Sequence, residues 1–348
     1  MAARVTLQTI ADALGVSRTT VSNAYNRPDQ LAPQLRRRVL DTAAELGYAG
    51  PRQAGRRLQS GRRGAIGLMF AERLSYAFTD PGAVVFLEGF TEATEEHGHE
   101  LLLLPGRRGT RQETRAVRDA VVGAFCMYRM PDMHPAVRAA MERRVPVVVV
   151  DEPHVPGSPF VGSDDQEGAR LAAAHVVRLH HRRVAILTER LIDDGYEGFA
   201  DSRRIAGASR RVSRERVTGY LVPLAPAEPV AVYDVDGNSP GHGARGALEL
   251  LDASPRPTAL LCSSDALAFG AMAALRERGV DVPGDMSVVG FDDVPAAAGA
   301  GLTTVRRPLK QKGREACRLL TDPAAEREVI LAPALVERRS TGPPPASA

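Results

Sequence analysis

The feature that most constrains the fold is a regular alternation, from Gly64 onward, of short apolar runs with longer runs of helical period. The apolar runs have the length of strands and cover residues 65–70, 100–105, 123–128, 145–151, 183–188, 230–235, 259–264 and 287–292. The runs of helical period follow them at residues 83–97, 112–121, 134–143, 166–178, 213–222, 241–252, 265–278 and 308–321. Apolar strands separated by helices predict parallel sheets that are covered on both faces. Eight such units predict two doubly wound sheets, and therefore an α/β fold with two lobes.

Residues 6–46 follow a different pattern, which predicts three short helices. The predicted helices cover residues 6–14, 18–25 and 33–46. Thr6 and Ser17 are candidate N-caps, and Gly15 is a candidate helix stop between them. The apolar side chains at helical spacing, including Leu46 at the end of the third helix, are expected to be buried. Two short helices joined by a glycine turn and braced by a third are typical of a helix-turn-helix head.

The second predicted helix carries side chains suited to reading DNA bases. Its spacing turns Val21 inward and leaves Arg18, Thr19, Ser22 and Asn23 outward. Arginine can donate two hydrogen bonds to guanine, and asparagine can pair with adenine, in the major groove. A generic small helical bundle is the alternative, although it gives no reason to place these four side chains on one exposed face.

Charge is unevenly distributed along the chain. Residues 1–63 contain eleven arginines, no lysine and four acidic residues, a net charge of +7, so the rest carries −4 of the overall +3. A basic head on a mildly acidic body predicts that the head meets a polyanion. Charge alone leaves DNA, RNA and a membrane surface as possible partners of the head.

Residues 49–63 are basic and contain glycine, which is the composition of a linker. Their single large apolar side chain is Leu58, which either inserts into a partner or packs on its own domain. The last eight residues, 341–348, are rich in proline and small residues and are expected to be disordered.

The remaining composition predicts a cytoplasmic protein without a membrane segment. No apolar run approaches 18 residues, and the N-terminus lacks the pattern of an export signal. The three cysteines, Cys126, Cys262 and Cys317, are widely spaced and odd in number, and we expect them to be small buried side chains in a reducing compartment.

Enzyme chemistry has little support in the sequence. Gly241 to Gly246 match the GxGxxG pattern of dinucleotide sites, but five residues separate the preceding strand from the first glycine. A glycine-rich helix entry is the simpler interpretation, and we expect no cofactor and no metal. His180 and His181 are expected in a surface loop, and no nucleophile lies near a base in the sequence, so catalysis is not expected.

Two pairs of acidic residues are candidates for a ligand-binding site. Asp164 and Asp165 precede a predicted helix, whose positive end they would favour. Asp292 and Asp293 come directly after a buried strand. Open α/β sheets bind ligands at the carboxyl ends of their strands, so we expect at least one of Asp292 and Asp293 to face a ligand.

The head resembles the DNA-binding head of the lactose-repressor/galactose-repressor (LacI/GalR) family, through an IA-x-x-LGVS-x-x-TVS-x-x-x-N core ending in LGY. The remainder resembles that family's effector domain, a two-lobed fold similar to periplasmic binding proteins, through GAIGLMF, VPVVVVDEP, SVVGFDDVP and LTTVRRP. The similarity spans about residues 4–340.

The resemblance implies a homodimeric transcription regulator, usually a repressor, that binds a pseudo-palindromic double-stranded DNA operator. A small molecule, sugar-like or nucleoside-like, would bind between the lobes and change operator affinity. The implied organisation is a head over residues 1–48, a hinge over 49–63 and an effector domain over 64–340. Lobe 1 would comprise about residues 64–162 and 303–331, and lobe 2 about residues 163–302 and 332–340.

The family's functional positions transfer residue by residue. The base readers would be Arg18, Thr19 and Asn23, with Leu58 as a wedge in the minor groove. The other DNA-binding residues would be Thr6, Ser17, Thr20, Ser22 and Asn26. The effector-binding residues would be Phe78, Asp151, Arg216, Ser264 and Asp292.

Departures from the family pattern leave some questions open. Ser264 stands where asparagine is common, which weakens the expectation of a standard hexose. Residues 191–213 are longer than the family norm and are either a lid or a surface insertion. The alternatives in function are a solute-binding protein, an enzyme on a doubly wound fold, and a DNA-binding protein that no longer senses an effector.

Overall fold

The computed structural model describes residues 6–26, 30–46, 64–106, 109–224, 230–322 and 324–346. The chain forms two compact units, Met1–Ala65 with Val121–Gly123, and Ile66–Ala120 with Ala124–Ala348. The hinge with Leu58 lies outside the described residues. No helix in the described part of the chain has the length and apolar character needed to cross a membrane.

The first unit contains the three predicted helices, α1 (Leu7–Leu14), α2 (Arg18–Asn26) and α3 (Pro33–Glu45). Thr6 caps α1 by accepting a hydrogen bond from the Thr9 backbone N–H, and Gly15 ends it with a φ of 64°. At this φ only glycine avoids the steric cost of a Cβ, so the sequence itself sets the turn between α1 and α2. The prediction of a helix-turn-helix head is confirmed.

The core of the head is small and has contributions from all three helices. Its fully or nearly buried members are Ile10, Ala11, Val21, Ala24, Val39 and Ala43. Leu46 is 37 % exposed, so its predicted burial is wrong. The reason is that α3 ends at Glu45, and the residue after it no longer follows the buried face of the helix.

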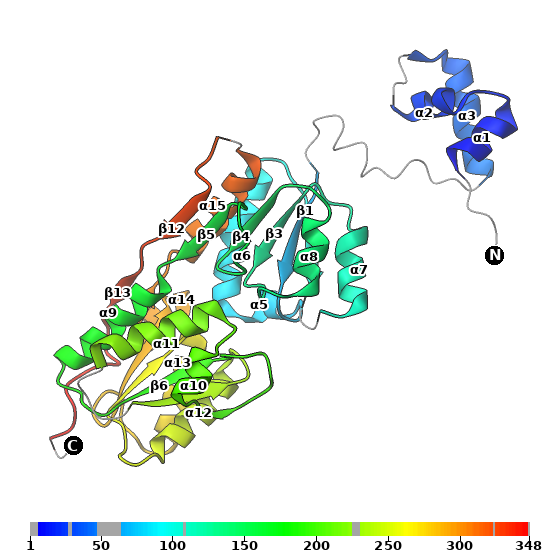
Figure 1. The fold of residues 1–348 in the computed structure, drawn as a ribbon. Helices are drawn as coiled ribbons and strands as arrows, with labels where there is room; N and C mark the ends of the chain where they lie inside the picture. Colours follow the sequence, from blue (N-terminus) through cyan, green and yellow to red (C-terminus); the bar gives the residue numbers. More distant parts are fainter. Residues whose placement is uncertain are drawn as a thin grey trace. The chain divides into compact units, whose positions relative to one another are not determined.

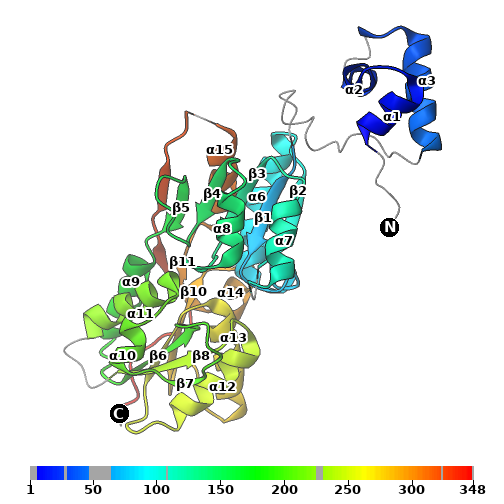
Figure 2. The ribbon, with the colours of Figure 1, turned by 45° about the vertical axis from the view of Figure 1, so that its right-hand side comes forward.

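The second unit contains two sheets, which define two lobes (Figures 1 and 2). Lobe 1 has an all-parallel sheet in the order β12-β5-β4-β3-β1-β2. Its strands are β1 (Ile66–Phe70), β2 (Leu101–Pro105), β3 (Ala124–Tyr128), β4 (Val147–Val150), β5 (Phe160–Ser163) and β12 (Glu328–Leu331). Its helices are α5 (Tyr76–Thr79), α6 (Pro81–Glu96), α7 (Arg111–Asp119), α8 (Pro135–Met141) and α15 (Leu309–Thr321).

Lobe 2 has a sheet in the order β13-β11-β10-β9-β6-β8-β7, in which both edge strands run antiparallel to their neighbours. Its strands are β6 (Val184–Glu189), β7 (Gly198–Phe199), β8 (Ala231–Val235), β9 (Ala259–Cys262), β10 (Ser287–Asp292), β11 (Thr303–Arg306) and β13 (Ala334–Val336). Its helices are α9 (Asp165–Arg178), α10 (Ser202–Ala206), α11 (Arg211–Leu224), α12 (Pro240–Leu251), α13 (Asp265–Glu277) and α14 (Pro295–Ala300).

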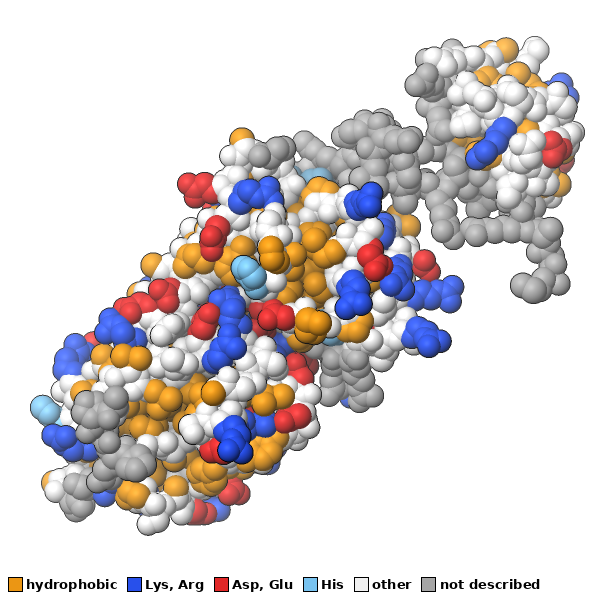
Figure 3. All heavy atoms as spheres, in the orientation of Figure 1, with side chains coloured by type: hydrophobic (Ala, Val, Ile, Leu, Met, Phe, Trp, Pro, Cys, Tyr) orange, Lys and Arg blue, Asp and Glu red, His pale blue; other side chains and the backbone are white. Residues whose placement is uncertain are grey.

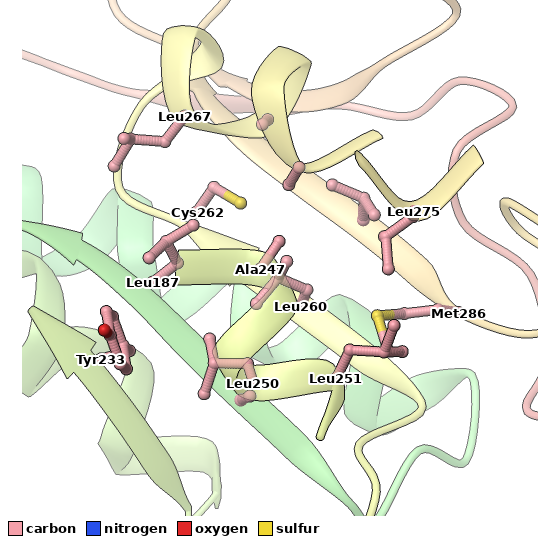
Figure 4. Close-up of a cluster of buried hydrophobic side chains, with 14 of the residues drawn as sticks. Leu187, Tyr233, Ala247, Leu250, Leu251, Leu260, Cys262, Leu267, Leu275 and Met286 are labelled. Atoms are coloured by element: carbon pink, nitrogen blue, oxygen red, sulfur yellow. The ribbon is translucent and has the colours of Figure 1, made fainter. Parts of the chain in front are cut away.

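Helix pairs cover both faces of the lobe 2 sheet. Helix α9 packs against α11, and α12 packs against α13. Figure 4 shows the apolar layer beneath α12 and α13, where Leu250 and Leu275 meet Leu187 and Leu260 of the sheet. A second layer, with Val217 and Tyr220 of α11, lies on the opposite face. Burial on both faces explains why the strands are continuously apolar in the sequence.

The predicted strands and helices are all present, but one lobe boundary is wrong. Residues 303–306 were expected in lobe 1, and they form β11, a strand of the lobe 2 sheet that pairs with β10. The chain crosses to lobe 1 only at Arg307, before α15 packs on α6. The four-residue strand is too short for its sequence to indicate which sheet it joins.

The predicted disorder of the tail is also wrong for its first residues. Gly342 donates its backbone N–H to the Ser287 hydroxyl at 3.0 Å, and its carbonyl lies 2.9 Å from Nε2 of His181. His181, expected in a surface loop, is 3 % exposed and also contacts the Thr258 hydroxyl at 2.9 Å. Pairing between residues 161 positions apart leaves no local signal in the sequence.

The Gly241–Gly246 motif serves helix packing. A Cβ on Gly243 would lie 2.1 Å from the Leu267 carbonyl oxygen of α13, and one on Gly246 would lie 2.3 Å from a Leu187 methyl group. Gly241 has no atom closer than 3.8 Å to that position. The first two contacts show that glycine is needed so that α12 can approach its neighbours closely.

We therefore expect Gly243→Ala to lower the free energy of unfolding by about 1–2 kcal/mol, because α13 must shift to admit the methyl group. Gly241→Ala is the matched control and should leave stability unchanged or raise it by about 0.5–1 kcal/mol. Urea unfolding followed by circular dichroism measures both. Similar losses in the two variants would contradict the packing role.

Candidate functional site

The surface of α2 in the head is the first candidate site. Arg18 and Thr19, at its first turn, are exposed, while Val21 and Ala24 on the opposite face are fully buried. Arg36 of α3 donates from Nε to the Ala24 carbonyl oxygen at 3.3 Å. Helix α2 is therefore packed against the rest of the head through its buried face, and its N-terminal turn is exposed to solvent.

The other predicted DNA-binding residues have distinct places in the head. The Ser17 hydroxyl caps α2 by accepting the Thr20 backbone N–H at 3.0 Å, and the two hydroxyls lie 2.8 Å apart. Ser22 and Asn23 are half-buried, and Thr6 is exposed at the start of α1. The side chain of Asn26 lies outside the described residues, as does Leu58.

The second candidate site is a cavity between the lobes of the second unit. Its lining comes from both lobes: Phe70, Ala71, Glu72, Tyr76, Tyr128 and Arg129 from lobe 1, and Glu189, Arg190, Arg210, Ser213, Gly237 and Asn238 from lobe 2. Most of these residues follow the carboxyl ends of strands, where open α/β sheets bind ligands. The volume is about 30 Å³, room for one or two water molecules. The lobes must therefore part to admit a ligand of ordinary size.

Beside this cavity lies a buried network of charged side chains. Arg216 donates from Nε to Asp165 at 2.8 Å, and both side chains are wholly buried. Arg307 donates two hydrogen bonds to one oxygen of Asp292, at 2.9 and 2.6 Å. Lys312 of α15 pairs with Asp151. Each carboxylate therefore has a cationic partner, although the Oδ2 atoms of Asp151 and Asp165 have no hydrogen-bond partner among the described residues.

Backbone geometry sets the same region apart. Arg129, Asp151 and Asp292 adopt positive φ angles of 51°, 63° and 125°, which side chains with a Cβ rarely occupy. Such conformations cost on the order of 1–3 kcal/mol each and cluster at functional sites. Arg129 and Asp151 directly follow β3 and β4, and Asp292 ends β10, so all three lie where strands end at the gap between the lobes. Positive φ angles also occur elsewhere, at Arg144 and His180.

The structure brings together three of the five predicted effector residues. Asp151, Arg216 and Asp292 belong to the network, in which Arg216 Nη2 lies 4.0 Å from Asp292. Ser264 lies nearby, caps α13, and donates to the Asn238 amide oxygen at 2.5 Å. Phe78 is 67 % exposed and does not line the cavity. Tyr76, two residues earlier, does.

Several residues of the site were missed in the sequence. Arg129 pairs with Glu189 at 2.6 Å across the lobes, and Asp165, Arg307 and Lys312 complete the buried network. Arg129 directly follows a predicted strand, so its position was a usable signal. Lys312 lies within a helix of mixed composition, and nothing local distinguishes it from a surface lysine.

The environment shifts the pKa values of the acidic residues in opposite directions. Burial raises the pKa of Asp165, but the charge of the adjacent Arg216 outweighs it and holds this pKa below its usual range. The same balance holds at Glu189, where burial raises the pKa but the charges of Arg129 and Arg216 have the larger effect and lower it to about 2. At Asp80, burial raises the pKa to about 7, because the Ala83 hydrogen bond and the charge of Arg129 lower it too little to offset burial and the charges of Asp292 and Glu189.

The raised pKa of Asp80 predicts a pH dependence. In the unfolded chain this carboxyl loses its proton near pH 4, whereas the folded protein keeps it up to about pH 7. The folded state therefore binds more protons between these values, and the free energy of unfolding should fall as pH rises through this window. Asp80→Asn should weaken that fall, because asparagine still caps α6 but does not titrate.

Urea unfolding at about pH 5 and about pH 8 measures the effect. Burial also raises the pKa of Asp265 to about 7. Asp265 therefore lowers the free energy of unfolding over the same pH range, and this contribution remains in Asp80→Asn. Asp164→Asn is the matched control, since Asp164 caps α9 at an exposed position. An unchanged difference between the two pH values in Asp80→Asn would show that Asp80 is ionised throughout.

Among the described residues, no group of three or more histidine, cysteine, aspartate or glutamate side chains is placed to hold a metal ion. Charged side chains of both signs are interspersed over the face drawn in Figure 3.

Comparisons with known proteins agree with this geometry. The family described as bacterial regulatory proteins, lacI family, matches residues 6–50, and the periplasmic binding protein-like domain matches residues 173–341. An HTH-type transcriptional regulator of Mycobacterium tuberculosis is 42 % identical to this chain, over 98 % of each sequence.

Two solved structures are similar over nearly the whole chain. A LacI family transcriptional regulator from Corynebacterium glutamicum has a TM-score of 0.74 and 34 % identity, covering 97 % of this chain and 99 % of that one. The transcriptional regulator CelR in complex with cellobiose has a TM-score of 0.67 and 27 % identity, covering 97 % of this chain and 100 % of that one.

Proposed function

Because this chain belongs to the lacI family of bacterial regulatory proteins, we propose that it is a sequence-specific DNA-binding transcription regulator whose operator affinity depends on a small molecule held between its lobes. It acts as a homodimer on a pseudo-palindromic operator, in the cytoplasm, and without catalysis. The observation that carries the proposal is the head, where α2 buries Val21 and Ala24 and leaves Arg18 and Thr19 exposed at its N-terminal turn.

The exposed turn of α2 suits the major groove of DNA. Arg18 provides a guanidinium that can donate to guanine, and Asn23 an amide that can pair with adenine. Ser17, Thr20 and Ser22 supply hydroxyls for phosphates, which fix the position of the head but carry no sequence information. The eleven arginines among residues 1–63 supply most of the affinity, through release of counterions. In the hinge, Leu58 acts as a wedge in the minor groove.

The effector site is the gap between the lobes. The structural neighbour CelR was solved with cellobiose, so a sugar-like or nucleoside-like ligand is the first class to test. Such a ligand offers hydroxyls that donate to carboxylates and accept from guanidinium groups, and Asp151, Arg216 and Asp292 provide both kinds of partner. The ligand shifts operator affinity only through its preference for one arrangement of the lobes. An arrangement that separates the two hinges weakens binding, and one that brings them together strengthens it.

Selection from random duplex DNA with the purified full chain tests the proposal. We expect enrichment of a two-fold symmetric site, and loss of binding as salt rises. A thermal-shift series with cellobiose, hexoses and nucleosides then tests the effector site. No preference for any duplex would overturn the regulator proposal. Operator binding with no shift by any compound would instead favour a DNA-binding protein that has lost its effector.

A further inference from the structure

Residues 190–211 connect β6 to α11 and contain β7, the edge strand of the lobe 2 sheet; we call this segment the strap. Its interior is fastened to lobe 2. Arg204 donates to Asp234 at 2.8 Å and to Asp194 at 2.9 and 3.0 Å, and its guanidinium lies 4.1 Å from the centre of the Tyr196 ring. The strap interior is therefore an ordered part of lobe 2, and the contacts with lobe 1 described next lie at its two ends.

The first end of the strap contacts lobe 1 through Arg190. Its guanidinium pairs with Glu72, which follows β1 of lobe 1. On the lobe 2 side the same guanidinium donates to the Asp236 carboxylate at 2.8 Å and to the Asp236 carbonyl at 2.9 Å. Arg190 is thus held in lobe 2 while it reaches across the gap.

The second end contacts lobe 1 through Arg210 and Arg211. Arg210 lies 3.0 Å from a Glu152 carboxylate oxygen and donates to the Arg129 carbonyl at 3.1 Å. Arg211 donates its backbone N–H to Glu152 at 2.9 Å, and its guanidinium bonds the Asp151 carbonyl. Glu152 and Arg210 are 2 % and 6 % exposed, so water reaches this pair only when the lobes part.

Both ends of the strap border the interlobe cavity, which Arg190 and Arg210 line. We propose that the strap locks the two lobes together, and that Arg190 and Arg210 are the groups an effector must satisfy in order to bind. The proposal rests on the function proposed above, since it assigns the gate of that same effector site.

The chemistry of the two arginines limits the ligand. When the lobes part, Arg190 loses its charge-assisted hydrogen bond to Glu72, and Arg210 loses its ion pair with Glu152. A ligand that settles in the gap must replace them with acceptor oxygens at two separated positions. Hydroxyl, carboxylate and phosphate oxygens all satisfy this requirement, whereas a purely apolar ligand does not.

The distance between the lobes tests the lock without any ligand or DNA. Nitroxide labels at Met133→Cys in lobe 1 and Val222→Cys in lobe 2 suit double electron–electron resonance, because both positions are exposed and the three native cysteines are buried. When the labelled chain is mixed with excess unlabelled chain, so that most dimers carry one labelled protomer, the otherwise unchanged chain should give one distance. Arg190→Gln combined with Arg210→Gln should add a longer distance and lower the ratio of closed to open molecules by about tenfold or more.

Two further variants distinguish the loss of the interlobe ion pairs from a general loss of folded structure. Glu72→Gln combined with Glu152→Gln removes the same two pairs from the lobe 1 side and should give the same longer distance. Arg203→Gln changes an exposed strap residue and should leave the distance as it was. Circular dichroism spectra that match the parent protein exclude unfolding as the cause.

The outcomes are distinct from those that test the regulator function. Distances in both double variants that superpose on the parent protein's would overturn the lock, even if operator binding is normal. An open parent protein in the absence of ligand would also overturn it. A chain that binds no operator, yet opens when the pairs are removed, would refute the regulator function and support the lock.

Discussion

Arg216→Met is expected to lower the free energy of unfolding by about 3–5 kcal/mol, because it leaves Asp165 as a buried carboxylate without its closest cation. The two side chains are wholly buried and bonded at 2.8 Å. The nearest remaining cation, Arg307, stays 3.7 Å from Asp165, too far for a hydrogen bond. Methionine fills a similar volume, so the loss of the charge dominates the effect. Urea unfolding of the full chain followed by circular dichroism measures it.

The matched control is Arg170→Met. Arg170 pairs with Glu167 at 2.6 Å, but these side chains are 45 % and 39 % exposed, so we expect little or no change in the free energy of unfolding. Adding Asp165→Leu to Arg216→Met should recover much of the loss, since a buried pair replaced by apolar side chains is often neutral. An Arg216→Met variant as stable as the control would mean that water reaches Asp165 in the folded protein.

The same substitution bears on the effector site. Arg216 is a predicted effector residue, yet in this structure it is bonded to Asp165 and to the Ser263 carbonyl, with the Phe291 ring 4.2 Å away. Its Nη2 is buried and has no hydrogen-bond partner within the described part of the chain. A ligand oxygen near Asp292 would satisfy this donor, so Arg216→Met should weaken effector binding as well as stability.

Arg18→Ala is expected to weaken binding to the selected operator by about 1–3 kcal/mol and to change binding to random DNA little. Arg18 is exposed at the first turn of α2, where its guanidinium can reach a base edge, and it does not contribute to the core of the head. Fluorescence anisotropy with operator and scrambled duplexes at one fixed salt concentration measures both affinities.

Arg18→Lys tests whether Arg18 contacts a base, because lysine keeps the charge but lacks the planar guanidinium that can donate two hydrogen bonds to guanine. We expect it to lose specificity nearly as far as Arg18→Ala does. Full affinity in Arg18→Lys, or equal losses on both duplexes in Arg18→Ala, would assign Arg18 to a phosphate instead of a base.

Local patterns in the sequence were sufficient to predict the longer elements, but not the short ones, which are α5, α10, α14, β5, β7, β11, β12 and β13. The apolar face of Ile10 and Ala11, the cap at Thr6 and the stop at Gly15 predicted α1 within one residue. The run 287–292 predicted β10 completely, because a strand buried on both faces is continuously apolar. Asp151, Arg216 and Asp292 were also placed together, but only through family resemblance.

Long-range contacts are where prediction failed. Thr303–Arg306 was assigned to the wrong lobe, and Gly342 was expected to be disordered although it bonds His181 and Ser287. In each case the deciding neighbour is distant in sequence or depends on the path of a short segment.

The sequence by itself determined the kind and order of the longer elements, the head with its exposed arginine, and the two lobes, because hydrophobic period and helix caps act within a few residues. Only the tertiary structure decided which charges meet. Arg190 and Glu72 lie 118 positions apart, and Lys312 and Asp151 lie 161 apart. The sequence does not show whether an arginine or a lysine is solvated or paired with a buried carboxylate, because only the folded structure determines which side chains are removed from water.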